Sequence, residues 1–346
     1  MMGLFSSLFG KREPQPESER PPDAELDAGE ALDSPDGALR VDAARALLER
    51  WRSGDVHAAE VLAPRLGDLL EDPEPLVRAA ALSGVRLLRK PENLARCESA
   101  VLALLADPVP QVRTAAIWSA LRLPGEAARA RVRAILESGE ESMRFAAACA
   151  LSDLQDTAAL PELQAALADD HRRQEALSAL MSLGDPSAVP EIAKVFEDES
   201  LGEFDRTLAG AALARFGDAR GAGHLVARIE SDGDDRPIAA EWAGRLGVQD
   251  AIPALDALAG TDGDAAQGAA IRALGRLKAP GAEQRLIRIT ADGASPDDLR
   301  MDAAEGLAEL GTPAALDLLR KLAAEGPEEL RQLCAELLAE VQTDAG

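Results

Sequence analysis

A segment of seventeen residues sets the main constraint on this chain, because altered copies of it recur through most of the sequence. It is DPVPQVRTAAIWSALRL, from Asp107 to Leu123, and Ala120 serves as its reference position. Nine further copies align, about 32 residues apart on average, on Leu47, Val85, Leu151, Leu180, Leu213, Ala243, Leu274, Leu307 and Leu338. Arg stands seven residues before the reference position in nine of the ten copies, and Ala stands four before it in nine of ten. This register predicts an array of repeated units rather than a compact domain.

Each copy follows a second apolar stretch, and both stretches show the three- and four-residue spacing of amphipathic helices. The starts of first helices are indicated by Pro161, Pro190 and Pro253. The ends of second helices are indicated by Gly184, Gly217, Gly247 and Gly311. Because 47% of the residues are hydrophobic but only 3% are aromatic, the core must consist of Ala, Leu, Val and Ile. We expect an all-α fold, a right-handed α-solenoid of about ten helix-turn-helix repeats over residues 37–342.

The two recurring residues have predicted structural roles. The Ala lies on the stripe where paired helices approach most closely, which a small side chain permits. The Arg lies at the edge of that stripe, about 20° from the reference position on a helical wheel. Its periodicity predicts a ladder that joins neighbouring units through Asp or Glu side chains and carbonyl groups.

Two units carry a family resemblance. DPEPLVRAAALSGVRLL from Asp72 and the copy from Asp107 resemble HEAT repeats, whose second helix often opens with Asp-Pro and carries Val-Arg before small residues. The shorter units with AVPEI at Ala188 and AIPAL at Ala251 are similar to the HEAT-like repeats of bilin-lyase relatives. The resemblance covers residues 37–342 and implies a solenoid. It leaves the function open, since proteins with such repeats include scaffolds, transport factors and a few enzymes.

Composition and motifs disfavour several classes of function. The chain has 37 Lys and Arg against 61 Asp and Glu, a net charge of -24, which would repel nucleic acid. It contains no apolar run of about 18 residues that could span a membrane. Its three cysteines form no CxxC pair, and its three histidines form no HExxH motif. We expect no catalytic residue, no cofactor and no metal, and a cytoplasmic location.

Two aromatic residues are candidates for binding a partner. In a solenoid the second helices usually line the concave side, and positions six and two before the reference position point away from the buried stripe. Trp118 and Phe145 occupy these positions in adjacent units. They are predicted to be an exposed pair that anchors a partner protein; the alternative is that they belong to the core. Trp242, one residue before the reference position, is interpreted as core.

Four arginines form the second candidate surface. They come from three consecutive units, on or beside the same face, and are Arg215, Arg245, Arg272 and Arg276. One hypothesis is a basic patch for an acidic peptide or another anionic group. The alternative is that neighbouring Glu residues pair with them.

The N-terminal residues form the third candidate. In residues 1–12, MMGLFSSLFGKR, the apolar residues Leu4, Phe5, Leu8 and Phe9 recur at helical spacing before two basic residues. This segment could tether the chain to a membrane surface or a partner, or could be a disordered start. Residues 13–36 are predicted to be a disordered acidic, Pro-rich linker, and residues 343–346 a disordered end.

The favoured interpretation is a non-enzymatic, monomeric, cytoplasmic scaffold that binds a protein partner on its concave face. The N-terminal segment could hold it at the inner face of the membrane. A first alternative is a cofactor-handling enzyme similar to the bilin lyases. A second, a HEAT-like enzyme of DNA base excision, would require a basic groove.

Overall fold

The computed structural model describes residues 28–344, and within this range it contains α-helices and short 3₁₀ helices but no β-strand. After a short helix α1 (Ala28–Ala31), the helices alternate between an outer and an inner layer. The outer helices are α3 (Val56–Leu62), α4 (Leu66–Leu69), α6 (Pro91–Leu104), α8 (Glu126–Ser138), α10 (Leu160–Ala166), α12 (Val189–Glu197), α14 (Ala219–Glu230), α16 (Ile252–Ala259), α18 (Ala282–Ala291) and α20 (Pro313–Glu325). The inner helices are α2 (Gly37–Arg52), α5 (Pro75–Val85), α7 (Pro110–Ala120), α9 (Glu141–Ser152), α11 (Arg173–Leu183), α13 (Glu203–Arg215), α15 (Arg236–Arg245), α17 (Gln267–Arg276), α19 (Asp297–Leu310) and α21 (Glu328–Asp344).

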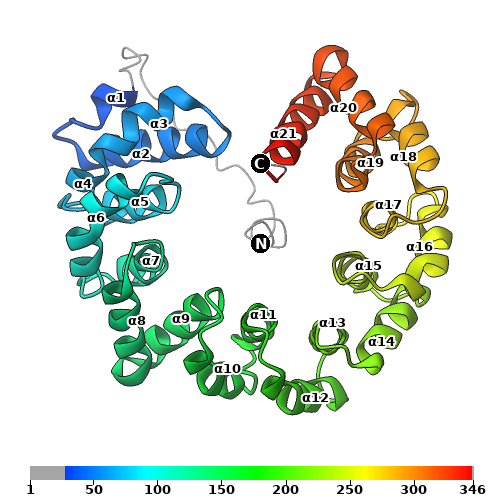
Figure 1. Ribbon diagram of the computed structural model, residues 1–346, viewed down its shortest axis with the longest axis horizontal. Helices are drawn as coiled ribbons and strands as arrows, with labels where there is room; N and C mark the ends of the chain where they lie inside the picture. Colours follow the sequence, from blue (N-terminus) through cyan, green and yellow to red (C-terminus); the bar gives the residue numbers. More distant parts are fainter. Residues whose placement is uncertain (1–27, 345–346) are drawn as a thin grey trace.

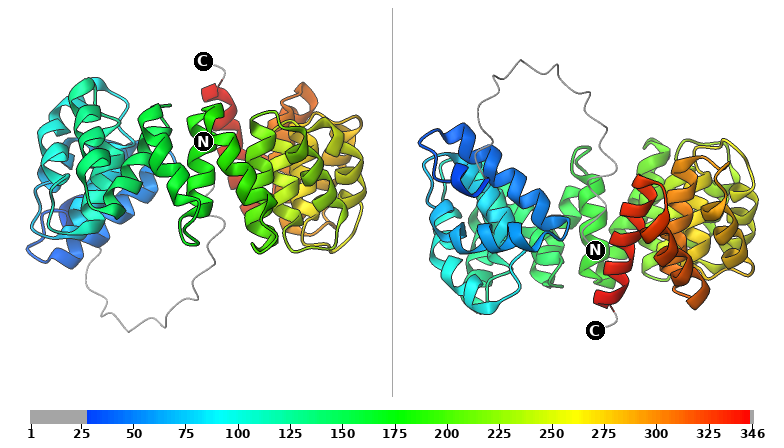
Figure 2. Two further views of the ribbon diagram at one scale, coloured as in Figure 1. Left: turned by 90° about the horizontal axis from the view of Figure 1, so that it is seen from below. Right: turned by 90° about the horizontal axis from the view of Figure 1, so that it is seen from above.

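The helix pairs follow one another around an open ring, with the second helix of each pair on the inside (Figure 1). Each inner helix packs against the next, from α2 against α5 to α19 against α21. Seen from the side, most helices stand across the plane of the ring (Figure 2). The predicted α-solenoid, with its second helices on the concave side, is confirmed. None of the helices within residues 28–344 is long and apolar enough to cross a bilayer.

The helix ends follow the predicted signals. Pro161, Pro190 and Pro253 lie in the first turns of α10, α12 and α16. Gly184 and Gly311 end α11 and α19 in left-handed conformation, with φ of 70° and 67°. In this conformation glycine carries no penalty from a Cβ atom.

Small residues bring the inner helices together. The recurring Ala, and Cys334 in its place in the last unit, are at most 5% exposed. Glycines add still closer contacts in the C-terminal half. A Cβ atom on Gly244 would lie 2.8 Å from Cβ of Ala273, and one on Gly275 would lie 2.4 Å from the carbonyl oxygen of Gly306. These distances leave no room for a larger side chain between α15, α17 and α19.

The packed array begins before residue 37, which corrects the predicted linker boundary. Leu32 is only 3% exposed. Arg65 donates to the carbonyl oxygen of Gly29 at 2.8 Å and forms an ion pair with Asp33 at 2.9 Å. Residues 28–36 therefore belong to the first unit, and α21 continues two residues past the predicted end at residue 342. The N-terminal segment with Leu4, Phe5, Leu8 and Phe9 lies outside the described residues.

Candidate functional site

The recurring Arg forms a ladder at the starts of the inner helices. Arg78 shows the arrangement: its Nε and Nη2 donate to the two carboxylate oxygens of Asp107, at 2.8 and 3.0 Å, and its Nη1 donates to the carbonyl oxygen of Asp72 at 2.8 Å. Asp107 belongs to the next unit, where it also accepts from the amide of Val109. Both side chains of the ion pair are buried, with exposures of 11% and 3%. One guanidinium group therefore joins two units.

Other units repeat this arrangement. Ion pairs to an acidic residue of the following unit are Arg40–Asp72, Arg113–Glu140, Arg144–Glu162, Arg173–Asp205 and Arg236–Asp264. Gln267, which replaces the Arg in one unit, keeps the contact with a carbonyl group. Its side-chain amide donates to the carbonyl oxygen of Ala259 at 3.2 Å. The predicted structural ladder is confirmed in these units, whereas Arg206 and Arg300 pair with Glu203 and Asp297 of their own helices.

The aromatic pair on the inner layer is exposed only in part. Trp118, on α7, is partly buried, and the guanidinium of Arg86 lies 5.9 Å from the centre of its ring. Phe145, on α9, is only 7% exposed, so its predicted exposure was wrong. The reason is the next unit: the guanidinium of Arg172 lies 5.4 Å from the Phe145 ring and is held there by Glu141 at 2.6 Å. Trp118 remains as the accessible member of the pair.

Trp242 is likewise partly buried. It packs against both apolar clusters of the solenoid, the N-terminal one and the C-terminal one. Arg245 lies 5.9 Å from its ring. Trp242 therefore packs against the core, as predicted, but it also contacts a charged side chain.

The predicted basic patch is neutralised by carboxylates. Arg276 pairs with Glu241 and with Glu309 at 2.9 Å, and Arg245 pairs with Glu241 at 2.6 Å. Burial would raise the pKa of Glu241, but Arg276 and Arg245 hold it below its ordinary value. The hypothesis of a free patch is therefore wrong at these positions, and its alternative is correct.

Arg272 completes this network. It pairs with Asp302 and lies 3.5 Å from Glu305. Burial raises the pKa of both carboxyl groups in spite of the nearby guanidinium. Arg215 and Arg245 are exposed, and Arg215 is the one of the four predicted arginines that makes no ion pair within the part of the chain that the structure describes.

A polar cluster at α13, α14 and α15 was missed at the sequence level. Thr207 is fully buried; its hydroxyl donates to Asp235 at 2.6 Å and lies 3.1 Å from Nε2 of His224. His224 packs edge-on against the ring of Phe196, and Arg228 pairs with Asp235. His224 is therefore half-buried between α13 and α14. A hydroxyl, an imidazole and a carboxylate thus meet, but a fully buried hydroxyl cannot reach a substrate, so the cluster is structural.

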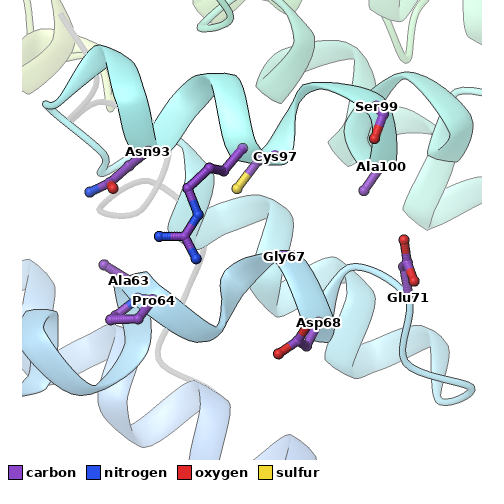
Figure 3. A pocket seen from close by; sticks show the side chains of 10 residues that line it. Ala63, Pro64, Gly67, Asp68, Glu71, Asn93, Cys97, Ser99 and Ala100 are labelled. Atoms are coloured by element: carbon purple, nitrogen blue, oxygen red, sulfur yellow. The ribbon is translucent and has the colours of Figure 1, made fainter.

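On the outer side of the array, a pocket of about 310 Å³ lies between α4 and α6 (Figure 3). Asn93 stands at one end and Glu71 at the other, with Gly67 and Ala100 between them. The polar groups do not converge on one point, so the pocket suggests no chemistry. Within residues 28–344, no group of three or more His, Cys, Asp or Glu residues could hold a metal ion.

Comparisons with known proteins identify the repeats. The family model described as HEAT repeats matches residues 97–181 and 262–339, and the model described as PBS lyase HEAT-like repeat matches residues 172–198. A search of curated protein sequences finds no match.

Several solved structures align with this chain. Human deoxyhypusine hydroxylase is 21% identical over 73% of this chain and 97% of its own, with a TM-score of 0.30. The CpcE–CpcF complex of phycocyanin lyase from Nostoc is 24% identical over 61% of this chain and 94% of its own, with a TM-score of 0.39. Kap121p is 17% identical over 92% of this chain and 40% of its own, with a TM-score of 0.40.

Proposed function

Because the chain is a solenoid of HEAT repeats, we propose that it is a non-enzymatic scaffold that binds a protein partner on the inner face of its ring. Trp118 is the observation that carries the proposal. It is a large aromatic side chain, partly exposed on an inner helix, in a chain with few aromatic residues. Tryptophan with a neighbouring arginine is the composition typical of interface residues that contribute most to binding. We also propose that the protein is monomeric and cytoplasmic.

The test compares partner capture by variants of the full chain. The wild-type chain is used to purify its partner from native cells, and the partner is quantified by mass spectrometry. Trp118→Ala should reduce capture about tenfold or more, while Trp118→Phe, which keeps an aromatic ring, should retain part of it. Circular dichroism should show unchanged helix content in both variants. Equal capture by the Ala variant would exclude Trp118 as the anchor.

A ligand-handling role is the second candidate, and the match of residues 172–198 to the PBS lyase HEAT-like repeat favours it. A protein of this kind would retain a pigment or another small molecule through purification. Under the scaffold proposal, by contrast, the absorption spectrum of the chain purified from its native cells should show no bands other than those of protein. A visible absorption band that persists through gel filtration would favour the ligand-handling role.

The proposed tether rests on the helical spacing of the apolar residues in residues 1–12. Replacing Leu4, Phe5, Leu8 and Phe9 together by Ser should reduce co-sedimentation of the full chain with anionic liposomes. The matched control replaces four surface Ala residues of the outer helices by Ser. Equal pelleting of the wild-type chain and the tether variant would end the tether proposal.

A further inference from the structure

The apolar core of the ring is divided in two at α13. One cluster of buried apolar side chains runs from Leu32 to Leu213, and the second runs from Ala211 to Cys334. The two clusters meet on this single inner helix, so α13, α14 and α15 join one half of the ring to the other (Figure 1). A polar cluster lies at the same place. We call it the polar junction, and it consists of Thr207, His224, Arg228 and Asp235.

The donors and acceptors of the polar junction follow from its partners. Burial would raise the pKa of Asp235, but Arg228 and Thr207 hold it below its ordinary value. Asp235 is therefore a carboxylate that only accepts, and the Thr207 hydroxyl donates its proton in the 2.6 Å bond to Asp235. The Thr207 oxygen must then accept in the 3.1 Å bond to His224, where the donor is Nε2–H.

The same bonds decide where His224 takes up a proton. Because Nε2 already carries a hydrogen, the free acceptor of the neutral ring is Nδ1. Cδ2 of the ring faces α13, since a Cβ atom on Gly210 would lie 2.9 Å from it. Nδ1 is on the opposite edge of the ring from Cδ2 and points away from α13. Phe196, which packs edge-on against the ring from α12, carries no charge.

The surroundings of His224 oppose a positive charge. Burial lowers the pKa of His224, and Arg206 and Arg228 lower it further. Glu203 and Asp235 act in the opposite direction, but both carboxylates are already paired with Arg228. The polar junction therefore favours the neutral form of the imidazole.

A positive charge on His224 loosens the polar junction. The free energy of the imidazolium falls when it turns from its half-buried site towards water. This movement breaks the bond to Thr207 and the edge contact with Phe196, both of which join α14 to an earlier helix. A hydrogen bond holds its partners at a defined angle. Once it is lost, α14 and the helices after it are freer to rotate against the helices before α13.

We propose that the polar junction is a pH-sensitive hinge of the ring. While His224 is neutral, the hydrogen bonds from His224 through Thr207 to Asp235 hold the two halves at one angle. Proton uptake by His224 breaks this connection, and the opening between the first and last helix pairs changes in width. The hinge goes beyond the proposed function and does not depend on it, because it concerns the shape of the chain without a partner.

Fluorescence energy transfer across the opening of the ring tests the hinge. Cysteines replace Ala46 on α2 and Ala335 on α21, both exposed, and carry the donor and acceptor dyes. The three native cysteines are buried, so the dyes attach to the introduced ones. The transfer efficiency of the full chain should change reversibly between pH 7.5 and pH 5. Its midpoint should lie below pH 6.5, since the folded chain binds the proton less readily than an ordinary histidine does.

Three variants of the labelled chain assign the change to the polar junction. His224→Gln cannot take up the proton and should keep the transfer efficiency of pH 7.5 throughout. The matched control is His57→Gln, at an exposed position on α3, which should respond as the labelled wild type does. Thr207→Val keeps the size of the side chain but removes the hydroxyl group, so its efficiency at pH 7.5 should already move towards the acid value. Circular dichroism should show the same helix content at both pH values.

Two results would overturn the hinge. One is an equal pH response of His224→Gln and the labelled wild type, and the other is a change in transfer efficiency that occurs only together with loss of helix content. The hinge and the proposed function can fail separately. If the response is absent but Trp118→Ala still loses the native partner, the scaffold stands without the hinge. If the response is present but Trp118→Ala captures the partner fully, the hinge stands and the proposed anchor fails.

Discussion

Six of the nine recurring arginines hold a carbonyl group of their own unit and a carboxylate of the next, so a single side chain stabilises each of these junctions between units. The Arg78–Asp107 pair is the most buried example, with exposures of 11% and 3%. Asp107→Ala would leave a buried guanidinium without its carboxylate and would remove the acceptor of the Val109 amide. We expect a loss of about 3 kcal/mol in the free energy of unfolding, measured by urea denaturation. Arg331→Ala, at an exposed position in the last unit, is the control and should change it by less than about 0.5 kcal/mol. Equal losses of stability in the two variants would show that the ladder contributes little to the free energy of unfolding.

His224 makes stability depend on pH. Burial, assisted by Arg206 and Arg228, lowers its pKa below the ordinary value of 6.5. As the pH falls below 6.5, the unfolded chain therefore binds a proton before the folded chain does, and the folded state loses stability until its own pKa is passed. Relative to His224→Gln, the wild type should lose stability between pH 7.5 and pH 5. Urea denaturation of both chains at several pH values measures this, and a constant difference between them would contradict the account.

Residues that follow the repeat could be predicted, and residues that depend on a neighbouring unit could not. The ladder was visible as a period in the sequence. The burial of Phe145 depends on Arg172 of the next unit, and the neutralisation of Arg276 depends on Glu241 and Glu309 of the units on either side. Arg172, Glu241 and Glu309 are not repeated in every unit. The helical wheel of one unit therefore could not show the cover over Phe145 or decide between a free and a paired Arg276.

At the scale of helices, close packing of α15, α17 and α19 depends on glycine. Gly275→Ala would place a Cβ atom 2.4 Å from the backbone of Gly306, so the helices would have to separate. We expect a loss of about 2 kcal/mol in the free energy of unfolding. Gly223→Ala, in α14 where no atom lies within 4 Å of the added Cβ, should instead stabilise by about 0.5–1 kcal/mol. Thermal and urea denaturation measure the stability of both variants. Stabilisation by Gly275→Ala would show that α17 and α19 have room for an added Cβ atom.

Helix type and order could be predicted because proline, glycine and apolar spacing act locally. The packing of residues 28–36 against the array could not, since it depends on contacts with Arg65 more than 30 residues away.

At the scale of the whole molecule, the two halves of the inner face differ. Its C-terminal half carries guanidinium groups that are paired with carboxylates, whereas its N-terminal half carries Trp118, whose ring lies beside the guanidinium group of Arg86. Under the proposed function, we expect a partner to bind across α5 and α7.

The most direct test is hydrogen–deuterium exchange of the full chain, alone and with its captured partner, read by mass spectrometry. The account predicts slower exchange in residues 75–90 and 110–122, at α5, α7 and the turns that follow them, with no change in the outer helices α6 and α8. Protection confined to the outer helices, or to the C-terminal inner helices α17 and α19, would contradict it.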